Sequence, residues 1–504
     1  MDKTCFLGFD IGSSSIKASL LEAATGTSIA SAVSPKTEME IYAPKAGWAE
    51  QNPETWWKHV RLALEELRAK APDWISHVNA IGISYQMHGL VLLDSKGQLL
   101  RDAIIWCDSR AVPYGEKAFK DLGEKYCLTH LLNSPGNFTA SKLAWVKDQE
   151  PDIFNSIWKI LLPGDYIAYK LTGEATTTPA GLSEGIFWDM AEDSVAIPLL
   201  KYFGFPSTLL PEVQPTFSIQ GKVQAETAKE LGIPAGIPVA YRAGDQPNNA
   251  FSLGVLEPGE LAATAGTSGV VYGITDTLSY DPESRVNTFI HVNHVPRSNH
   301  RRLGVLLCLN GTGILYRWLK ANTHSDTTAK AYEGMNEEAA KVPIGSEGLF
   351  IYPYGNGAER TLKNLNLGAS LQNLNFNLHH RGHLYRAAQE GIVCAIAYGL
   401  EIMQQMGLKI QTVKAGYANM FLSPVFRSIF TGVTGTRLLL YETEGAEGAA
   451  RGAGVGCGYY PSLRDAFKGL RLKAEEGSVP SEKPAYEKLY YSWKENLEKL
   501  LRNA

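Results

Sequence analysis

The stretch TCFLGFDIGSSSIKASLLEA, residues 4–23, joins two apolar runs through a turn of one glycine and three serines. The first run, Cys5 to Phe9, predicts a buried strand, and Asp10 follows it directly. After Ser15 the apolar residues alternate with other residues, and this period of two predicts a second strand rather than a helix. A strand–turn–strand unit excludes the dinucleotide-binding fingerprint, which needs a helix after its glycines. The sequence also contains no GxxxxGKS or GxxxxGKT motif, so we expect a phosphate loop of a different kind.

The same pattern returns in LAATAGTSGVVYG, residues 261–273, where a run of small apolar residues ends in a second glycine-rich turn. That turn consists of Gly266, Thr267, Ser268 and Gly269. Its first glycine lies 254 residues after Gly12 of the first loop. Two such loops, separated by about one domain, indicate a duplicated architecture with nucleotide between the halves. Two unrelated hairpin turns are the alternative, and the loops alone favour neither.

The bulk properties of the 504-residue chain restrict the class of protein. This length exceeds what one hydrophobic core holds and predicts at least two domains. A formal net charge of −4 gives no basic excess for nucleic acid or a membrane surface, and no apolar run is long enough for a transmembrane helix. The six cysteines form no CxxC pair, and the N-terminus is too polar for a signal peptide. We therefore expect a cytoplasmic protein with reduced thiols.

Helical and strand patterns alternate along the chain, which predicts the α/β class. Apolar residues recur at helical spacing in residues 53–71 and 386–406, and residues 484–504 form an amphipathic pattern. Residues 78–94 predict a strand, a turn and a second strand. The polar segment 279–302 predicts a surface connection.

Asp245 follows a short apolar strand pattern within YRAGDQPNNAFSLGV, residues 241–255. A carboxylate at a strand end can face a ligand. The same position also suits the cap of a helix that begins near Gln246, with Pro247 in its first turn. From these residues alone we favour the cap.

Two further segments carry side chains suited to a sugar, SYQMHGLVLLD at 84–94 and IIWCDSRA at 104–111. The first places polar and soft side chains at a strand end, where ligands bind in open α/β sheets. The second offers an indole face and planar hydrogen-bonding groups. A hairpin turn with a surface histidine, and an ordinary ion pair on a loop, are the alternatives. The candidate sugar-binding residues are Gln86, Met87, His88, Trp106, Asp108, Arg110 and, beside the acid, Gln246.

The chain resembles the FGGY carbohydrate kinases over nearly its whole length, through segments that occur in the family's order. These segments are DIGSSSIK, GWAEQNPETWW, SYQMHGLVLLD, IIWCDSRA, TASKLAWV, GDYIAYKLTG, AGDQPNNA, AGTSG, PYGNGAERT, HLYRAAQEG and AARGAGVG. The family shares its fold with hexokinase, actin and the heat-shock chaperone ATPases. The resemblance therefore implies two actin-like (ribonuclease H-like) domains with the active site in the cleft between them. We place these domains at residues 1–252 and 253–504.

The resemblance also implies a role for each motif. Asp245 matches the catalytic base, and Asp10 matches the residue that organises Mg²⁺, largely through water. Met87 and His88 match positions that touch the sugar. The implied ATP-binding residues are Gly12, Ser13, Ser14, Ser15, Lys17, Gly266, Thr267, Ser268, Gly269, Gly416, Ala418 and Asn419. Two segments depart from the family's glycine triplets, RAGD before the base and AGYANMF at the adenine segment.

We therefore expect ATP-dependent phosphorylation of a sugar. The segments QMHGLVLLD and WCDSR are similar to those of family members that convert D-xylulose to D-xylulose 5-phosphate. A kinase for gluconate, another ketose or a deoxy-ketose is the first alternative, and a sugar-sensing binding protein without catalysis is the second. A chaperone-like ATPase would have no use for QMHG and WCDSR. The expected partners are a small sugar and ATP, without nucleic acid or membrane, and a homodimer is common in such kinases.

Overall fold

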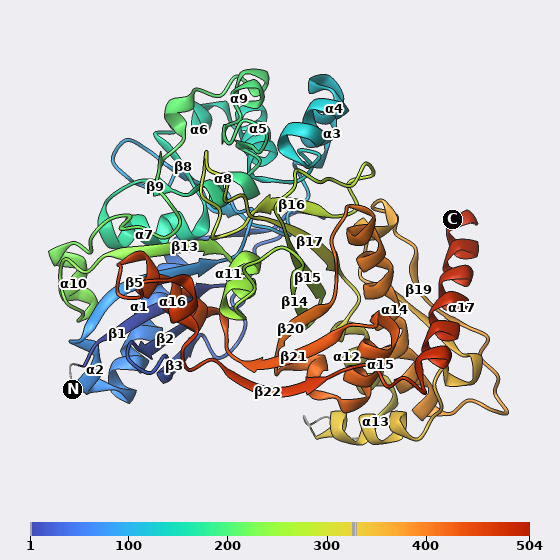
Figure 1. Ribbon diagram of the computed structural model, residues 1–504. Helices are drawn as coiled ribbons and strands as arrows, with labels where there is room; N and C mark the ends of the chain where they lie inside the picture. Colours follow the sequence, from blue (N-terminus) through green and yellow to red (C-terminus); the bar gives the residue numbers. More distant parts are fainter. Residues whose placement is uncertain (1–2, 325–327, 329, 504) are drawn as a thin grey trace.

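Two mixed β-sheets form the framework of the protein, whose computed structural model describes residues 3–324, 328 and 330–503 (Figure 1). The first sheet consists, in spatial order, of β13 (Val239–Gly244), β5 (Val78–Tyr85), β1 (Cys5–Ile11), β2 (Ile16–Glu22) and β3 (Ser28–Ser34). The second consists of β16 (Asn287–Ile290), β17 (Leu303–Leu309), β15 (Gly269–Thr275), β14 (Glu260–Ala265), β20 (Thr412–Gly416), β21 (Arg437–Glu442) and β22 (Arg471–Glu476).

The two sheets contain the same five-stranded unit. In the first, β1 pairs antiparallel with β2 and parallel with β5, and β2 and β5 continue to β3 and β13. In the second, β14 pairs antiparallel with β15 and parallel with β20, and these continue to β17 and β21. The two glycine-rich loops therefore occupy equivalent positions, each between the first and second strands of its unit. The predicted duplication is confirmed, and the interpretation as two unrelated hairpins is wrong.

Helices cover both faces of the first sheet. α1 (Pro53–Lys70) begins after Asn52, whose side chain accepts a hydrogen bond from the Glu54 N–H, and it buries one apolar face against β2 and β3. Removing such an apolar side chain from water contributes roughly 1.5–3 kcal/mol per large residue. The opposite face of the sheet carries α16 (Gly445–Gly456), which lies against β1, β5 and β13 (Figure 1).

α16 approaches the first sheet almost backbone to backbone, because glycine and alanine form its buried face. A Cβ atom placed on Gly8 of β1 would lie 1.8 Å from the Ala446 carbonyl oxygen. One placed on Gly82 of β5 would lie 1.9 Å from that of Ala449. Glycine is therefore required at both strand positions. α16 follows all five strands of the second unit in sequence, yet it covers one face of the first sheet. The predicted domain boundary between residues 252 and 253 stays a prediction.

The other predicted helices are confirmed as α14 (Arg381–Gln405) and α17 (Lys483–Arg502). The remaining helices are α2 (Pro72–Ile75), α3 (Val112–Leu122), α4 (Glu124–Tyr126), α5 (Thr139–Gln149), α6 (Pro151–Asn155), α7 (Pro163–Thr172), α8 (Pro179–Glu184), α9 (Ile197–Phe203), α10 (Ala225–Leu231), α11 (Asp245–Ser252), α12 (Gly313–Thr323), α13 (Ala331–Ala340) and α15 (Pro424–Thr434). The short strands are β4 (Glu50–Gln51), β6 (Val91–Leu93), β7 (Ala103–Ile104), β8 (Lys159–Leu161), β9 (Thr176–Thr177), β10 (Trp188–Asp189), β11 (Ser194–Val195), β12 (Glu212–Val213), β18 (Phe350–Tyr354) and β19 (Gly368–Gln372). Within the described ranges, no helix is both long and apolar enough to cross a membrane.

The composition of the polar segment 279–302 predicted a surface connection, but the structure buries much of it and leaves residues including 295 and 297–299 exposed. It contains β16, which is buried at the edge of the second sheet. Its polar groups are paired inside the protein: the Asn287 side-chain amide and the Thr288 N–H both donate to Asn133 Oδ1, at 2.9 and 3.0 Å. The Ile290 N–H donates to Ser183 Oγ at 3.0 Å. These distant partners satisfy side chains that would otherwise favour water.

Candidate active site

The first loop is a tight turn between β1 and β2, as predicted. The Gly12 N–H donates to the Ser15 carbonyl at 3.1 Å and closes the turn. Asp10 lies on β1 just before it, and Asp10 Oδ1 accepts a hydrogen bond from Ser84 Oγ at 2.9 Å. Lys17 lies opposite Asp10 in the β1–β2 register. The loop therefore holds a carboxylate and a cation at its base, with Ser13 and Ser14 between them.

Asp245 is the first residue of α11 and does not cap it, which corrects the interpretation favoured from sequence. Gly244 stands at the cap position, with φ −55° and ψ 155°, and α11 receives no side-chain cap. A capping side chain must precede the first helical residue to reach the free N–H groups of the first turn. Asp245 comes one residue too late for this. Its carboxylate therefore does not cap the helix, although it accepts hydrogen bonds from Gln246 and from its own N–H.

Burial and the neighbouring charge of Asp10 raise the pKa of Asp245 to about 7. Burial is the larger cause, and hydrogen bonds from Gln246 oppose the rise. Parallel pairing of β13 with β5 and of β5 with β1 brings both acids to the same edge of the sheet. A carboxylate whose pKa lies near neutral can accept a proton efficiently at physiological pH.

The second loop is held by the start of α12. The Gly313 N–H donates to the Gly266 carbonyl at 2.8 Å, and the Ile314 N–H donates to that of Thr267 at 3.1 Å. A Cβ atom on Gly313 would lie 2.4 Å from the Gly266 oxygen, so only glycine allows this approach. Ser268 completes the turn, and Gly269 begins β15.

A cavity of about 670 Å³ opens beside the second loop, and it joins that loop to the predicted adenine segment. Gly266 and Thr267 line one side, and Asn419 lies against Gly266 from the other. The rings of Tyr316 and Tyr332 stack at a centroid distance of 5.9 Å within its wall. Apolar ring faces beside a loop of backbone N–H groups suit a nucleoside phosphate.

Met420 of the adenine segment also lines this cavity, whereas Gly416 and Ala418 are not among its lining residues. Gly416 ends β20, and Ala418 precedes the short 3₁₀ turn η5 (Asn419–Leu422). Asn419 has a φ of 54°, a conformation that asparagine tolerates better than most residues. The segment therefore lacks the family's glycine triplet but still has one residue, Asn419, in the left-handed region. The nucleotide contacts of Gly416 and Ala418 stay predictions.

His88 is held in one orientation and in one tautomer. It has a φ of 63°, and Lys142 Nζ donates to its carbonyl at 2.8 Å. His88 Nδ1 lies 2.9 Å from the carbonyl oxygen of Glu184, and because a carbonyl only accepts, Nδ1 carries the proton. Burial, and then the charge of Lys142, lower the pKa of His88 to about 3, so the ring is neutral. His88 is therefore an oriented and largely buried histidine, with a side chain that is 17% exposed, rather than a surface one.

The residues before His88 are also buried. Gln86 and Met87 lie at the end of β5, and Gln86 Oε1 has no hydrogen-bond partner among the described residues. The Met87 side chain lies so close to Gly244 that a Cβ atom there would be 2.6 Å from Met87 Cγ. The predicted sugar segment and the strand that leads to Asp245 are therefore in contact.

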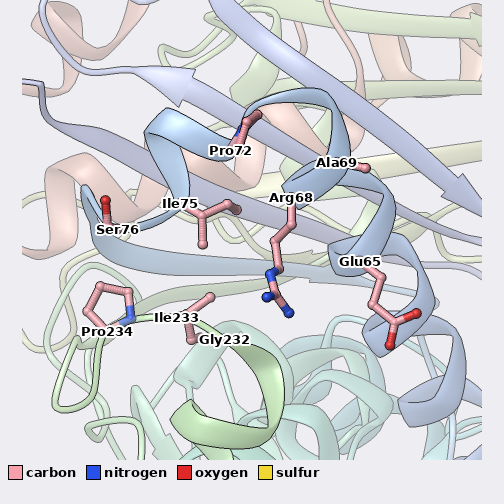
Figure 2. A pocket seen from close by; sticks show the side chains of 9 residues that line it. All are labelled: Glu65, Arg68, Ala69, Pro72, Ile75, Ser76, Gly232, Ile233 and Pro234. Atoms are coloured by element: carbon pink, nitrogen blue, oxygen red, sulfur yellow. The ribbon is translucent and has the colours of Figure 1, made fainter.

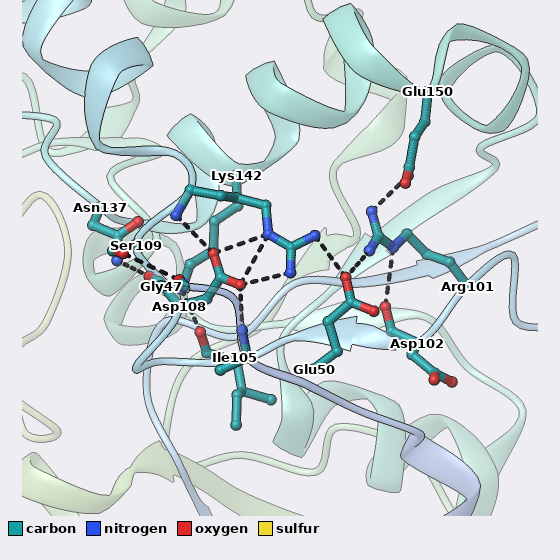
Figure 3. Close-up of polar contacts among 12 residues, drawn as sticks. Gly47, Glu50, Arg101, Asp102, Ile105, Asp108, Ser109, Asn137, Lys142 and Glu150 are labelled. Atoms are coloured by element: carbon teal, nitrogen blue, oxygen red, sulfur yellow. Dashed lines mark hydrogen bonds and ion pairs between the residues drawn. The ribbon is translucent and has the colours of Figure 1, made fainter. Parts of the chain in front are cut away.

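Asp108 and Arg110 belong to a buried ion network and are more than the ordinary ion pair on a loop that the alternative held. Figure 3 shows Asp108, Glu50 and Arg101 of this network. Arg110 Nη2 lies 2.6 Å from Asp108 Oδ2, and Arg110 Nη1 lies 2.6 Å from Glu50 Oε1. Arg101 also pairs with Glu50. Both Asp108 oxygens accept hydrogen bonds from protein groups, including the Ala49 N–H at 2.6 Å. The network fixes the loop, and direct contact of these two residues with a sugar stays a prediction.

Trp106 projects from this loop toward the first phosphate loop. The residue is 52% exposed, and its indole N–H donates to Ser13 Oγ at 3.2 Å. The structure thereby connects a predicted sugar-binding residue to a predicted phosphate-binding one.

Sequence reasoning missed several residues around His88. Glu184 is 2% exposed, and among the residues that the structure describes neither of its carboxyl oxygens has a hydrogen-bond partner of normal geometry. Burial raises its pKa well above the ordinary value, an effect that the nearby Tyr85 hydroxyl opposes. The rings of Phe138 and Phe289 lie 4.8 and 5.4 Å from the His88 ring. Arg360, which also approaches this group, had a signal, because it belongs to the quoted segment PYGNGAERT, and so did Lys142, which belongs to TASKLAWV.

A larger cavity, of about 750 Å³, lies elsewhere, between α1, α2 and the end of α10 (Figure 2). Arg68, Ile75 and Ile233 are among its lining residues, and none of the predicted site residues is. The size of a cavity therefore does not identify the site here.

Comparison with known proteins identifies relatives over most of the chain. The profile described as "FGGY family of carbohydrate kinases, N-terminal domain" matches residues 5–252, and that of the C-terminal domain matches residues 261–458. Xylulose kinase from Escherichia coli (strain K12) is 30% identical over 89% of this chain and 88% of that protein. Xylulose kinase from Rhodospirillum rubrum has a solved structure with a TM-score of 0.87 and 27% identity, covering 98% of this chain and 99% of that one. Gluconate kinase from Lactobacillus acidophilus shares the fold, with a TM-score of 0.88 at 21% identity and coverage of 99% and 98%.

Proposed function

The chain belongs to the FGGY family of carbohydrate kinases, and from this premise we propose that it phosphorylates D-xylulose, forming D-xylulose 5-phosphate. Carbohydrate kinase activity with ATP as co-substrate follows from the family. The choice of sugar rests on the xylulose kinases among its relatives and on the segments QMHGLVLLD and WCDSR. A gluconate kinase shares the fold and provides the alternative substrate.

One observation carries the kinase chemistry of the proposal: Asp245, which starts α11, lies at the same sheet edge as Asp10, where burial raises its pKa toward physiological pH. A sugar hydroxyl has a pKa far above neutral, so it attacks phosphorus only while its proton leaves to a base. In our proposal the Asp245 carboxylate accepts the proton of the hydroxyl on carbon five. The bond between that oxygen and the γ-phosphorus forms while the bond from phosphorus to the ADP oxygen breaks.

The two glycine-rich loops position the triphosphate in this proposal. Their small residues let backbone N–H groups approach phosphate oxygens closely, and hydroxyl groups of Ser14, Ser15, Thr267 and Ser268 add donors. The adenosine occupies the 670 Å³ cavity beside Gly266 and Asn419. Positioning of this kind is the main contribution that phosphoryl transfer requires from a protein.

Asp10 is the residue that we assign to Mg²⁺. Ser84 Oγ donates a hydrogen bond to one carboxylate oxygen of Asp10. The other oxygen lies close to the start of α16, where a Cβ atom on Gly445 would be 2.6 Å from it. Within the described residues, no group of three or more His, Cys, Asp or Glu side chains forms a metal cage. One carboxylate suits Mg²⁺, which keeps several waters and binds substrate phosphates. When bound, the ion offsets the negative charge of the triphosphate.

The test is sugar-dependent ADP release with a panel of D-xylulose, D-ribulose, 1-deoxy-D-xylulose and D-gluconate, at fixed ATP and Mg²⁺. We expect the highest kcat/KM with D-xylulose. Faster turnover of gluconate would transfer the proposal to the aldonate alternative. If calorimetry detects sugar binding but no sugar in the panel stimulates ADP release from ATP, the result would favour the non-catalytic sensor. The cytoplasmic location and the homodimer stay predictions, which localisation and light scattering can check.

A further inference from the structure

Arg360 reaches the sugar side of the site from the second half of the chain. It begins the 3₁₀ turn η4 (Arg360–Leu362), after β18. Its guanidinium carbon lies 6.0 Å from the centre of the Phe138 ring, and that ring packs edge-on against His88. The charge of Arg360 also contributes to the lowered pKa of His88. A cation from the C-terminal half therefore approaches the histidine that the N-terminal half holds.

This guanidinium has little to bind inside the protein. Its Nη1 donates to the Ser284 carbonyl at 3.3 Å, and within the described residues it forms no ion pair. Two other cationic side chains nearby do form ion pairs. Arg285 pairs with Asp281 at 2.7 Å, and Lys363, three residues after Arg360, pairs with Glu283. Burial lowers the pKa of Arg360, but its ordinary value is so high that the side chain stays charged. Donors of this side chain are thus left for a ligand.

His88 presents the opposite property. Its Nδ1 carries the proton and donates to Glu184, so Nε2 of the neutral ring has a lone pair and accepts. The ring lies between Phe138 and Phe289, and it is largely shielded from water. The two side chains therefore offer a donor and an acceptor beside the same aromatic ring.

We propose that Arg360 is a specificity-determining residue, which donates to a sugar hydroxyl while that hydroxyl donates to His88 Nε2. This inference rests on the proposed sugar kinase function and deepens it. A hydroxyl group can accept from Arg360 and donate to His88 at once. A carboxylate can accept a hydrogen bond from Arg360, but it has no proton to donate to His88 Nε2. The lone pair of the carboxylate oxygen would therefore face the lone pair of Nε2, which is unfavourable. The pair thus selects a neutral polyol, such as a ketose, over an aldonate.

A second consequence concerns the two halves of the molecule. His88 comes from the first half and Arg360 from the second, so the sugar contacts both when bound. A sugar that bridges them stabilises their approach, which excludes water from the phosphoryl group.

The experiment compares Arg360→Gln and Arg360→Lys with the wild type and with Lys363→Gln. Lys363→Gln removes one positive charge from the same loop at an exposed site and is the matched control. KM values for D-xylulose and ATP are measured separately, and thermal unfolding checks that each variant folds. We expect Arg360→Gln to raise the KM for D-xylulose about 10- to 100-fold, as for a lost hydrogen bond to a charged group, with the KM for ATP unchanged. Arg360→Lys keeps the charge without the planar guanidinium group, so its KM for D-xylulose should lie between those of the wild type and Arg360→Gln.

The second arm tests the selection against carboxylates with His88→Asn. Asparagine tolerates the φ of 63° at this position, and its amide can donate to a carboxylate. We expect the ratio of kcat/KM for D-xylulose to that for D-gluconate to fall at least about tenfold, since one good hydrogen bond is worth about that factor. An unchanged ratio would overturn the selection argument.

The outcomes separate this inference from the proposed function. A wild type that phosphorylates no sugar contradicts the function itself. A wild type that phosphorylates D-xylulose, with unchanged sugar KM in Arg360→Gln and Arg360→Lys, leaves the function standing and overturns the role of Arg360. An equal rise in both KM values would also overturn it, because it would show that the arginine only supports the fold.

Discussion

Replacing Asp245 by Asn tests the catalytic centre most directly. The substitution keeps the shape of the side chain and removes its ability to accept a proton at neutral pH. Loss of a general base lowers kcat by a factor of about 10² to 10⁴, which corresponds to about 3–5 kcal/mol of transition-state stabilisation. We expect this loss with little change in sugar affinity, because Asp245→Asn leaves the residues of β5 in place.

The pH dependence gives a second, independent reading. The base must be ionised, and burial together with Asp10 raises the pKa of Asp245 to about 7. In the wild type, log kcat/KM for the sugar should therefore rise with unit slope up to about pH 7 and then level off. In Asp245→Asn this slope should disappear. A variant with near wild-type turnover, or one with an unchanged acid limb, would refute the assignment of Asp245 as the base.

The same raised pKa makes a prediction about stability. The native state binds the Asp245 proton more tightly than the unfolded chain does, so stability from this group is greatest at low pH and is lost as the pH rises through about 7. A shift from 3.8 to about 7 corresponds to at most about 4 kcal/mol. Asparagine carries no charge to bury, so Asp245→Asn should melt at a higher temperature than the wild type at pH 8, with a much smaller difference at pH 4. Calorimetry at both pH values measures this, and an equal difference at the two would contradict the linkage argument.

Three further predictions follow from the site. Asp10→Ala should raise the Mg²⁺ concentration needed for half-maximal activity while calorimetric sugar binding is kept, and an identical Mg²⁺ titration would remove Asp10 from the metal site. His88→Ala should cost roughly 1–3 kcal/mol in sugar binding, measured as a rise in sugar KM with ATP KM unchanged; lower thermal stability with unchanged kinetic constants would instead make His88 purely structural. Asn419→Gly keeps the left-handed backbone and removes the amide, so it should raise ATP KM alone, and a wild-type value would exclude the amide from the nucleotide site.

Local patterns in the sequence were sufficient for the framework. The period of two after Gly12, and the apolar runs on either side of the glycine-rich turn at Gly266, predicted both hairpins, since such patterns are properties of neighbouring residues. The cap at Asp245 was predicted wrongly because a cap and a first helical residue differ by a single position. β16 was missed because its polar residues depend on Asn133, more than 150 residues earlier, which no local pattern reveals.

In the site, too, local motifs predicted some features, whereas others depend on distant contacts. The acids and both loops could be named from motifs. The buried state of Asp108 could not, because it depends on Glu50 and on the Ala49 N–H, which fold against it from about 60 residues away. Glu184 gave no signal, since an unpaired carboxyl becomes unusual only once its surroundings are known to lack partners. Sequence motifs nominate candidate reacting groups, and tertiary contacts decide which of these candidates already have partners inside the protein.

The position of α16 has a consequence for how the chain is made. The first sheet is complete in sequence once α11 has been synthesised, yet the helix that seals one of its faces ends only at residue 456. At about 5–20 residues per second, the ribosome needs roughly 10–40 s to add the intervening 200 or so residues. During that interval Gly8, Gly82 and their apolar neighbours face solvent or a chaperone. The nascent chain thus carries an unsealed sheet through nearly half of its translation, and a fragment that stops after α11 should aggregate unless residues 445–456 are supplied as a separate peptide.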